Sequence, residues 1–343
     1  MKIYLDTLPL RTGHQIRGIG RYTEGLLAAL QTAQIEVITS ADDLPQAEII
    51  HYPYFDLFLP SLPIHWHKKA VVTIHDVIPL EFPKAYQPGL QGNVNFLRQK
   101  FSLRFVKAVI TDSEYSKQQI AKLLRMKLEK IYVVPLAANP DLHLMNSSSL
   151  KDVQNKYQLP EKYILYVGDI NYNKNIPALI QAMTHLPSDV ELACVGINFR
   201  EQPIPEWQGL VNTIREARLE SRVHFIRNLG TKSNADLAAI YHGALCYVQP
   251  SLSEGFGLPI LEAMQCQTPV VASRRGSLPE VGGRHAVYVE PKPTAIANGV
   301  KEVLSWSDYD RMQWLSKASK WAAGFTWQKT VAGTINVYKR VLV

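Results

Sequence analysis

Short apolar runs that favour β-strands alternate with segments of helical spacing along the whole chain. A parallel strand pair needs a crossover connection, usually a helix, so this alternation predicts parallel sheets covered by helices. The sequence therefore predicts an α/β fold with doubly wound sheets. We expect strands at residues 2–6, 35–39, 48–52, 70–76, 107–112, 130–136, 163–168, 190–196, 223–227, 244–250, 269–273 and 286–290.

The length of 343 residues exceeds what one hydrophobic core usually fills. The alternation lapses between Pro140 and Pro160, where a run of serines lies. We therefore predict two Rossmann-like domains, at 1–150 and 151–324, that face each other across a cleft. Residues 325–343 have helical spacing with basic residues near the end, so we expect a closing helix that packs back towards the first domain.

Composition excludes several classes of protein. With 46% hydrophobic and 20% charged residues the chain is globular. Asp6 and Pro9 interrupt the apolar stretch that a signal peptide needs, and no apolar run approaches a membrane span, so we expect a cytoplasmic protein. Cys194, Cys246 and Cys266 lie in apolar contexts, which favours core positions over disulfides or a zinc site.

The net charge of +7 is spread over both halves of the chain, without the basic patch typical of nucleic-acid binding. It suits phosphate-bearing substrates and an anionic membrane surface equally well. Two basic amphipathic segments, 96–108 and 116–130, are candidates for peripheral contact with anionic lipid. They also fit ordinary helices with solvated faces.

The segment SEGFGLPILE carries two glutamates, Glu254 and Glu262, on either side of a glycine-containing turn. Pro259 is typical of a first helical position, so the turn joins a buried strand to a helix. Glycines let a backbone approach a ligand, and a helix N-terminus favours phosphate. Two carboxylates beside a phosphate site suit two polyols joined by phosphate, as in a nucleotide sugar. Alternatively, Glu254 is a solvated loop residue and Glu262 an ordinary glutamate favoured by the helix dipole.

An ordered set of motifs resembles the retaining, nucleotide-sugar-dependent glycosyltransferases of family four, which have the GT-B fold. The segment PSLSEGFGLPILEAMQCQTPVVAS with GSLPEVGG resembles the signature of that family, and Glu254 and Glu262 match its E-x7-E pair. The other motifs are GIGRYTEGLLAAL, VVTIHDVIPLEFP, TDSEYSKQQI, YILYVGDINYNKNIPALIQAM, VHFIRNLGTKSNADLAAIYHGA and FTW…VYKRVL. The resemblance implies two Rossmann-like domains, the first binding the acceptor and the second the nucleotide sugar.

The resemblance assigns Glu254 to the donor hexose and Glu262 to the ribose hydroxyls. The resemblance also implies that the backbone amides of Gly255, Phe256 and Gly257 contact the hexose, and that the N–H groups around Leu258 contact the phosphates.

The segment GDINYNKN begins at Gly168, the end of a predicted strand, and the resemblance implies that Gly168 is a donor-binding residue. Lys174 in this segment matches the diphosphate-binding lysine of the family. A cation there would stabilise the charge that builds on the leaving nucleoside diphosphate. The alternative is a solvated lysine in a turn. Many members have arginine where this chain has Asp169, so leaving-group stabilisation rests on Lys174, with a neighbour such as Arg227 as a further candidate.

In the first half, GIGRY follows the first strand and opens a helix. Gly18 and Gly20 are candidates for close approach of the backbone to the donor, and a plain flexible loop is the alternative. Arg17 and Arg21 flank the motif and are candidates for phosphate or acceptor binding.

His75 ends an apolar strand, at the edge where doubly wound sheets bind ligands. The resemblance places it near the donor sugar and the reaction centre, whereas a lone histidine at a strand end is more often structural. We interpret Asp76 as a structural residue that orients the loop.

The resemblance implies catalysis by His75, Lys174 and Glu254, without a protein nucleophile. In the mechanism usually proposed for this family, the departing diphosphate accepts the acceptor's proton, so the protein supplies positioning and charge stabilisation. Glu254 and Glu262 are therefore not the carboxylate pair of a glycoside hydrolase. The D-x-D sequence at 308–310 lies in a polar helical stretch and predicts a solvated surface, so we predict no metal and no other cofactor.

We expect a hexosyltransferase that extends a saccharide or lipid-linked acceptor of a cell-surface polysaccharide. RGIGRYT resembles openings of bacterial mannosyltransferases, which favours GDP-mannose over a UDP-hexose. The alternatives are a nucleotide-sugar epimerase and a non-catalytic nucleotide-sugar-binding subunit.

Overall fold

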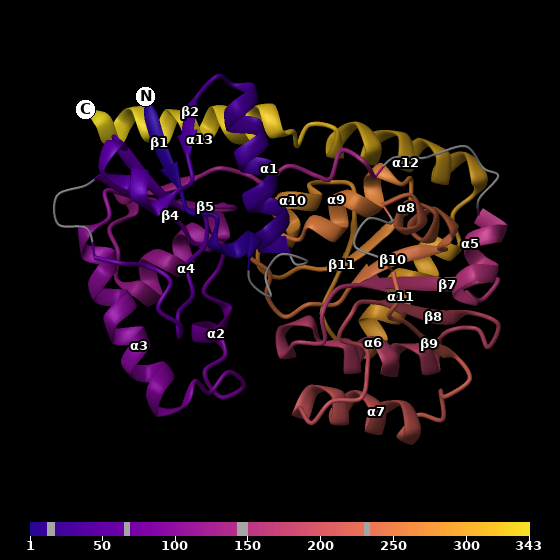
Figure 1. The fold of residues 1–343 in the computed structure, drawn as a ribbon. Coiled ribbons are helices and arrows are strands. Elements are labelled where there is room, and N and C mark those ends of the chain that lie inside the picture. Colours follow the sequence, from indigo (N-terminus) through magenta and orange to yellow (C-terminus); the bar gives the residue numbers. More distant parts are fainter. Residues whose placement is uncertain (12–17, 65–68, 143–149, 230–233) are drawn as a thin grey trace. The chain divides into compact units, whose positions relative to one another are not determined.

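The computed structural model describes the chain except residues 12–17, 65–68, 143–149 and 230–233 (Figure 1). The described residues form two compact units. Unit 1 consists of Met1–Ala137 and Phe325–Val343, and unit 2 consists of Ala138–Gly324.

Unit 1 is built on a six-stranded parallel sheet in the order β2-β1-β3-β4-β5-β6. The order reverses between β1 and β3, which makes the sheet doubly wound. The strands are β1 (Lys2–Leu5), β2 (Glu36–Ile38), β3 (Ile49–Tyr52), β4 (Lys69–Thr73), β5 (Ala108–Thr111) and β6 (Ile131–Val133). The flanking helices are α1 (Gly18–Thr32), α2 (Ile78–Glu81), α3 (Gly89–Ser102), α4 (Glu114–Leu124) and α13 (Trp327–Leu342) (Figure 1).

The terminal helix α13 is an integral part of unit 1. A Cβ atom added to Gly25 of α1 would lie 2.1 Å from the indole of Trp327, so only glycine lets these two helices approach so closely. Thr326 caps the start of α13 by accepting a hydrogen bond from the Lys329 backbone N–H. The Thr330 hydroxyl donates to the Pro135 carbonyl at 2.8 Å, which fixes the helix to the segment after β6.

Unit 2 is built on a second six-stranded parallel sheet, in the order β12-β11-β10-β7-β8-β9. This is the Rossmann order, with its switch point between β7 and β10. The strands are β7 (Tyr163–Val167), β8 (Glu191–Val195), β9 (Val223–Ile226), β10 (Cys246–Gln249), β11 (Val270–Ser273) and β12 (Val287–Val289). The helices are α5 (Leu150–Tyr157), α6 (Ile176–Ala182), α7 (Pro205–Glu216), α8 (Asn234–Gly243), α9 (Leu258–Gln265), α10 (Leu278–Gly282), α11 (Pro293–Leu304) and α12 (Asp308–Ala322).

The predicted α/β fold is confirmed, and each of the predicted strand runs contains or overlaps one strand. The central strands are buried on both faces, as parallel sheets require. The three cysteines are free and buried, as predicted.

The division between the units falls after Ala137, earlier than the predicted boundary at 150. The reason is that the segment after β6 is already bound to unit 2. Asn139 donates to Asn234 of α8 at 3.3 Å, and the Asn234 amide donates to Asp141 at 3.1 Å. Within the described ranges, no helix is both long and apolar enough to cross a membrane.

Candidate functional site

Two loops meet at the switch point of unit 2. The loop after β7 carries Lys174, and the loop after β10 carries Glu254. Because β7 and β10 are neighbours in the sheet, their carboxyl ends bring these side chains together.

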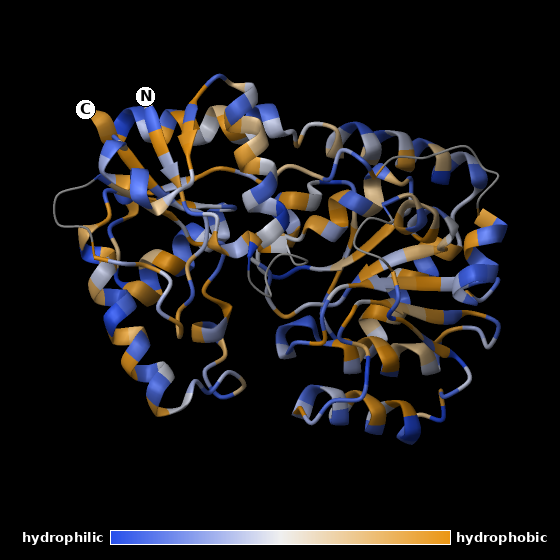
Figure 2. Cartoon of the chain, viewed as in Figure 1, coloured by the Kyte–Doolittle hydropathy of each residue, from blue (hydrophilic) through white to orange (hydrophobic). Residues whose placement is uncertain are grey.

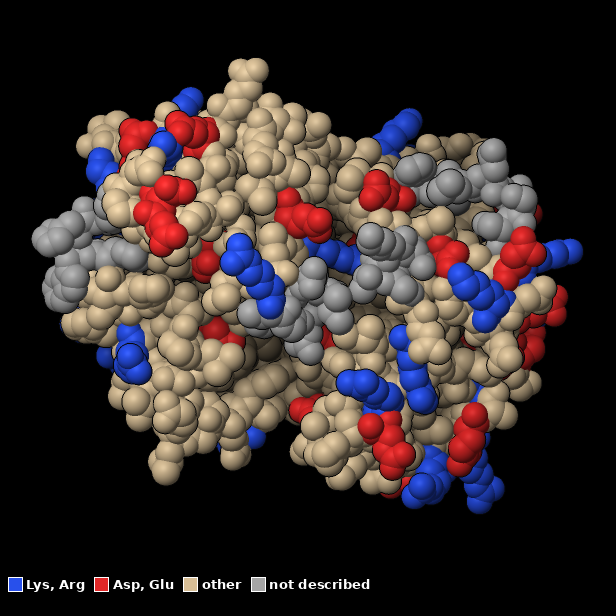
Figure 3. All heavy atoms as spheres, in the orientation of Figure 1, with Lys and Arg blue, Asp and Glu red and all other residues tan. Residues whose placement is uncertain are grey.

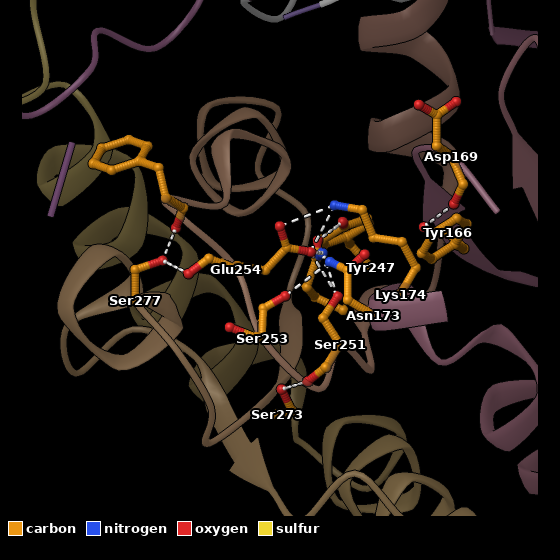
Figure 4. Close-up of polar contacts among 12 residues, drawn as sticks. Tyr166, Asp169, Asn173, Lys174, Tyr247, Ser251, Ser253, Glu254, Ser273 and Ser277 are labelled. Atoms are coloured by element: carbon orange, nitrogen blue, oxygen red, sulfur yellow. Dashed lines mark hydrogen bonds and ion pairs between the residues drawn. The ribbon is translucent and has the colours of Figure 1, made fainter. Parts of the chain in front are cut away.

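Lys174 and Glu254 form an ion pair (Figure 4). The Lys174 Nζ atom lies 2.7 Å from Oε1 and 2.9 Å from Oε2 of the carboxylate. Glu254 is only 6% exposed, and Gln249 and Ser251 also donate to its Oε1 atom, each at 2.7 Å. The alternative of a solvated loop glutamate is therefore wrong, and so is that of a solvated turn lysine, because the Lys174 side chain is largely buried.

The two loops are tied to each other by further hydrogen bonds. Lys174 ends a short 3₁₀ turn in which the Asn173 side chain donates to the Ser253 carbonyl at 2.9 Å. The Asn175 side chain donates to the Pro250 carbonyl at 3.0 Å. These bonds hold the lysine-bearing loop in register with the glutamate-bearing loop.

The glycine-containing turn between the two glutamates is tightly packed. Gly257 has φ = 103°, and a Cβ atom there would lie 2.7 Å from Leu278. Gly276, in the loop after β11, has φ = 60°, and its Cβ atom would lie 2.6 Å from the Glu254 nitrogen. The neighbouring Ser277 hydroxyl donates to the carbonyls of Glu254 and Phe256 at 2.9 and 2.7 Å (Figure 4). Side chains at either glycine would displace the turn.

Glu262 lies in α9, the helix that begins at Leu258 directly after this turn. It is buried and accepts a hydrogen bond from the Tyr241 hydroxyl of α8 at 2.9 Å, so it is not an exposed helical glutamate. Burial raises the pKa of Tyr247 well above its ordinary value, and the charges of Glu254 and Glu262 raise it further. Both carboxylates therefore lie near the same buried phenol.

Asp169 has a partner of its own. Its Oδ1 atom accepts a hydrogen bond from Asn198 at 2.6 Å, and its carbonyl accepts one from Tyr166 at 2.7 Å. In Figure 4 its carboxylate points away from Lys174. Arg227 is exposed and follows the edge strand β9, with β8 between it and β7.

Gly168 adjoins Asp169 at a point where two loops are in close contact. A Cβ atom on Gly196, which follows β8, would lie 2.2 Å from the Gly168 carbonyl oxygen. Gly168 itself has φ = 150°. A Cβ atom on Gly168 would lie 2.9 Å from the Tyr166 hydroxyl, so packing within unit 2 already favours glycine there.

Unit 1 contains a second charged pair. The Nδ1 atom of His75, after β4, lies 2.8 Å from Oδ2 of Asp112, after the neighbouring strand β5. The ring of Tyr22 packs edge-on against the imidazole at 4.8 Å between centroids. The Asp76 carboxylate accepts a hydrogen bond from the Ile78 backbone N–H at 3.0 Å, which confirms that it orients the loop.

The two members of this pair change each other's protonation. Burial lowers the pKa of His75, but the Asp112 carboxylate outweighs it and leaves that pKa above its ordinary value. Burial raises the pKa of Asp112, and the charge of His75 opposes that rise. Among the described residues, the His75 Nε2 and Asp112 Oδ1 atoms are buried without a hydrogen bond.

Behind the pair lies a neutral hydrogen-bond network. His51 Nε2 lies 2.8 Å from the Thr73 hydroxyl, and His51 Nδ1 lies 2.6 Å from the Tyr338 hydroxyl of α13. The Tyr22 hydroxyl joins the Thr73 hydroxyl at 3.2 Å. Burial lowers the pKa of His51 to about 3, so this imidazole is neutral.

Comparison with known proteins identifies the family. Residues 149–321 match the family described as glycosyl transferases group 1, and residues 42–142 match glycosyltransferase family 4. The chain belongs to the glycosyl transferases group 1. It is thus a glycosyltransferase, and the predicted family is confirmed.

Relatives of this glycosyltransferase include two from Escherichia coli. The O-antigen chain mannosyltransferase B is 33% identical over 302 residues, which cover 85% of this chain and 74% of the relative. The serotype-specific mannosyltransferase WbdA is 26% identical over 321 residues, which cover 92% of this chain and 39% of the relative.

Two solved structures have the same fold. Sucrose-phosphate synthase from Thermosynechococcus elongatus superimposes with a TM-score of 0.76 and 20% identity over 99% of both chains. Anabaena Alr3699/HepE in complex with UDP and glucose superimposes with a TM-score of 0.75 and 17% identity, over 99% of this chain and 100% of that chain. The GT-B fold of the glycosyltransferase is thereby established.

The glycine motif of the glycosyltransferase lies at the start of α1. Gly18 is exposed, and no described atom lies within 4 Å of a Cβ built on it. Packing among the described residues therefore does not require glycine there. Gly20 is buried, Arg21 is exposed, and Arg17 lies outside the described residues.

The D-x-D sequence of the glycosyltransferase forms the first turn of α12. Asp308 and Asp310 are exposed, and the Asp310 backbone N–H donates to the Ser307 hydroxyl at 3.1 Å. The prediction of a solvated surface is confirmed. Across the described ranges, His, Cys, Asp and Glu form no group of three that would hold a metal ion.

Sequence reasoning missed several polar partners in the glycosyltransferase. Asp112 was not assigned to His75, although both follow strand-like runs that end in a polar residue. Gln249 and His51 were not singled out either. Each stands in an otherwise apolar strand, and a polar residue in such a run is the signal that would have found it.

Proposed function

We propose that this glycosyltransferase moves a hexose, with mannose favoured, from a nucleoside diphosphate sugar to a saccharide or lipid-linked acceptor of a cell-surface polysaccharide. The anomeric configuration is retained. The observation that carries the proposal is the Lys174–Glu254 pair at the switch point of unit 2. The names of the O-antigen mannosyltransferase and of the HepE complex support the acceptor class and the donor class.

Lys174, Glu254 and Glu262 each bind a different part of the donor in this proposal. Lys174 binds the diphosphate and stabilises the charge that develops as it leaves. Glu254 accepts a hydrogen bond from a hexose hydroxyl, and Glu262 accepts hydrogen bonds from the ribose. The backbone N–H groups at the start of α9 add to the phosphate contacts.

Catalysis needs no protein nucleophile in this proposal. The departing diphosphate takes the proton of the acceptor hydroxyl, while the protein positions both substrates. The family resemblance assigns His75 to catalysis, and its raised pKa suits a hydrogen-bond donor to a sugar hydroxyl. Neither a metal ion nor another cofactor takes part, because Lys174 supplies the cation.

The donor site is tested by thermal-shift measurements with GDP, UDP, ADP and their sugars. At least one pair should raise the melting temperature, and GDP with GDP-mannose should raise it most. Glu262→Ala should weaken the binding of the free nucleotide, whereas Glu254→Ala should mainly impair sugar transfer. Equal effects of the two variants on free-nucleotide affinity would contradict these roles.

A peripheral membrane contact is the second part of the proposal, and α3 carries it. Four large apolar side chains on this helix are exposed at helical spacing: Leu90 (89%), Val94 (52%), Leu97 (67%) and Phe101 (42%). Residues four, seven and eleven positions apart lie on one helix face. Orange recurs along α3 in Figure 2.

The charge around this stripe favours an anionic lipid surface. No acidic residue occurs between Glu81 and Asp112, whereas Lys84, Arg98, Lys100, Arg104 and Lys107 do. Figure 3 shows blue side chains and no red ones over the part of this face that α3 forms. Apolar residues flanked by cations are the pattern of a helix that lies in a membrane interface.

Of the two predicted segments, only 96–108 shares this surface, which begins earlier, at Leu90. Helix α4 (Glu114–Leu124), which overlaps the segment 116–130, has no exposed large apolar residue, and Leu128 lies beyond it. We therefore place the contact on α3, at the inner face of the cytoplasmic membrane.

Vesicle flotation tests this surface. Wild type should bind vesicles rich in phosphatidylglycerol and release them at high salt. Leu97→Ser should reduce binding several-fold, while Leu128→Ser, the matched change at an exposed leucine outside α3, should not. Equal loss in both variants, or binding that ignores lipid charge, would overturn the assignment.

A further inference from the structure

The Glu254 carboxylate is held unequally at its two oxygens. Oε1 accepts three hydrogen bonds, from Lys174, Gln249 and Ser251, each at 2.7 Å. Oε2 accepts a single one in the described part of the chain, from Lys174 at 2.9 Å. The carboxylate therefore has one saturated oxygen and one with capacity left.

The amide of Gln249 has its orientation imposed by the strand that carries it. Tyr247 and Gln249 are two positions apart on β10, so their side chains lie on the same face of the sheet. The Tyr247 hydroxyl donates to the Gln249 Oε1 atom. That leaves the amide nitrogen for Glu254 and for the Ser251 hydroxyl, at 2.7 and 2.9 Å.

Tyr247 is the donor in this arrangement. It is fully buried, and its pKa lies well above the ordinary value, so it keeps its proton. The hydroxyl proton of Tyr247 is donated to Gln249, which is itself only 1% exposed. The buried Tyr247 hydroxyl thus fixes the orientation of the Gln249 amide, on a side that is not exposed to solvent.

We propose that Gln249 is a positioning residue for the transfer reaction. Its amide, oriented by Tyr247, holds Oε1 of Glu254 so that Oε2 alone is presented to the donor hexose. The inference rests on the proposed function, because it takes the hexose as the ligand of Glu254.

The role becomes important when the donor binds. A hexose hydroxyl then takes the Oε2 atom, so Glu254 exchanges part of its ionic contact with Lys174 for a neutral hydrogen bond. A buried carboxylate without donors is costly, and hydrogen bonds to a charged acceptor are about twice as strong as neutral ones. Gln249 and Ser251 keep two such bonds on Oε1, so the carboxylate stays in place.

This role separates sugar recognition from nucleotide recognition. The free nucleoside diphosphate has no hexose and does not use Glu254. Loss of the Gln249 donor should therefore weaken the binding of the nucleotide sugar and leave the binding of the nucleotide unchanged. A purely structural role would weaken both equally.

The test is calorimetric titration of Gln249→Leu with GDP-mannose and with GDP, and with UDP-glucose and UDP as a second pair. We expect about tenfold weaker binding of the nucleotide sugar that wild type prefers, and less than about twofold change for its free nucleotide. The matched control is Gln265→Leu in α9, whose side-chain oxygen is buried without a hydrogen bond among the described residues. It should change neither affinity.

A second variant keeps the test informative if Gln249→Leu folds poorly. Tyr247→Phe removes one hydroxyl and frees the amide to reverse, so it should weaken the nucleotide sugar in the same direction but less. If Tyr247→Phe and Gln249→Leu both bind the nucleotide sugar like wild type, or lose both ligands equally, the positioning role is wrong. If wild type itself binds none of the four ligands, the proposed function fails instead.

Discussion

Two charged pairs, one in each unit, differ in how many other groups support them. Lys174–Glu254 and His75–Asp112 both join loops that follow neighbouring strands, at 2.7 and 2.8 Å. Glu254 has further donors on its oxygen, whereas Asp112 and His75 each keep a buried atom without a hydrogen bond among the described residues.

The difference shows two ways of burying charge. A carboxylate with neutral donors remains satisfied when its cation moves, so its partner is free to bind something else. A carboxylate that depends on one imidazole loses its ionic partner when that imidazole becomes neutral, and a single hydrogen bond is then all that supports it. Removing Lys174 from the pair in unit 2 should therefore lower activity, whereas removing the charge of Asp112 from the pair in unit 1 should lower stability.

The largest expected effect is on transfer, in Lys174→Ala. Loss of the cation should lower kcat about a thousandfold, because a preorganised charge stabilises the leaving diphosphate. The free energy of unfolding should fall by less than about 1 kcal/mol, since Gln249 and Ser251 still bind Glu254. Initial rates and urea unfolding measure the two quantities. Lys156→Ala, which removes an exposed ion pair with Asp236, is the control and should leave kcat unchanged.

The second effect is on stability, in Asp112→Asn. The amide keeps the shape but removes the charge beside His75, and the free energy of unfolding should fall by about 2 kcal/mol. Urea unfolding is the measurement, with Asp189→Asn at an exposed ion pair as control. A loss no larger than that of the control would show that the pair in unit 1 is as well supported as the one in unit 2.

The third expected effect is a dependence of stability on pH, which comes from the charged pair in unit 1. The pKa of His75 is raised above its ordinary 6.5, so the stability it contributes is complete below about 6.5 and is lost as pH rises through the folded value. His51, with a pKa of about 3, stays neutral throughout. The melting temperature of wild type should fall as the pH rises above about 6.5, and that of His75→Gln should fall less. Parallel curves for the two proteins would contradict the raised pKa.

The smallest effect is expected at Asp169. Its carboxylate binds Asn198 and points away from Lys174 in Figure 4. Asp169→Asn should change the affinity for the nucleoside diphosphate less than about twofold. Calorimetry measures it, and a large gain in affinity would mean that Asp169 opposes the phosphate directly.

The sequence predicts the strands well, because apolar runs bounded by polar residues mark them wherever they occur. It also singles out Glu254 and Lys174, through motifs that lie close to each residue, and the structure joins the two in an ion pair. Asp112 escapes because its link to His75 depends on which strands are neighbours, and strand order is not encoded locally. The apolar face of α3 was only partly predicted, because helical spacing does not tell which stripe the rest of the unit covers.

The return of the chain to unit 1 has a consequence for biosynthesis. Trp327 fills the space beside Gly25, and Tyr338 binds His51, so the first unit cannot complete its core from residues 1–137. On the ribosome, all of unit 2 emerges before these residues do. The usual order of domain folding, from the N-terminus onwards, is therefore reversed here: unit 2 is fully synthesised before unit 1 receives the helix that completes its core.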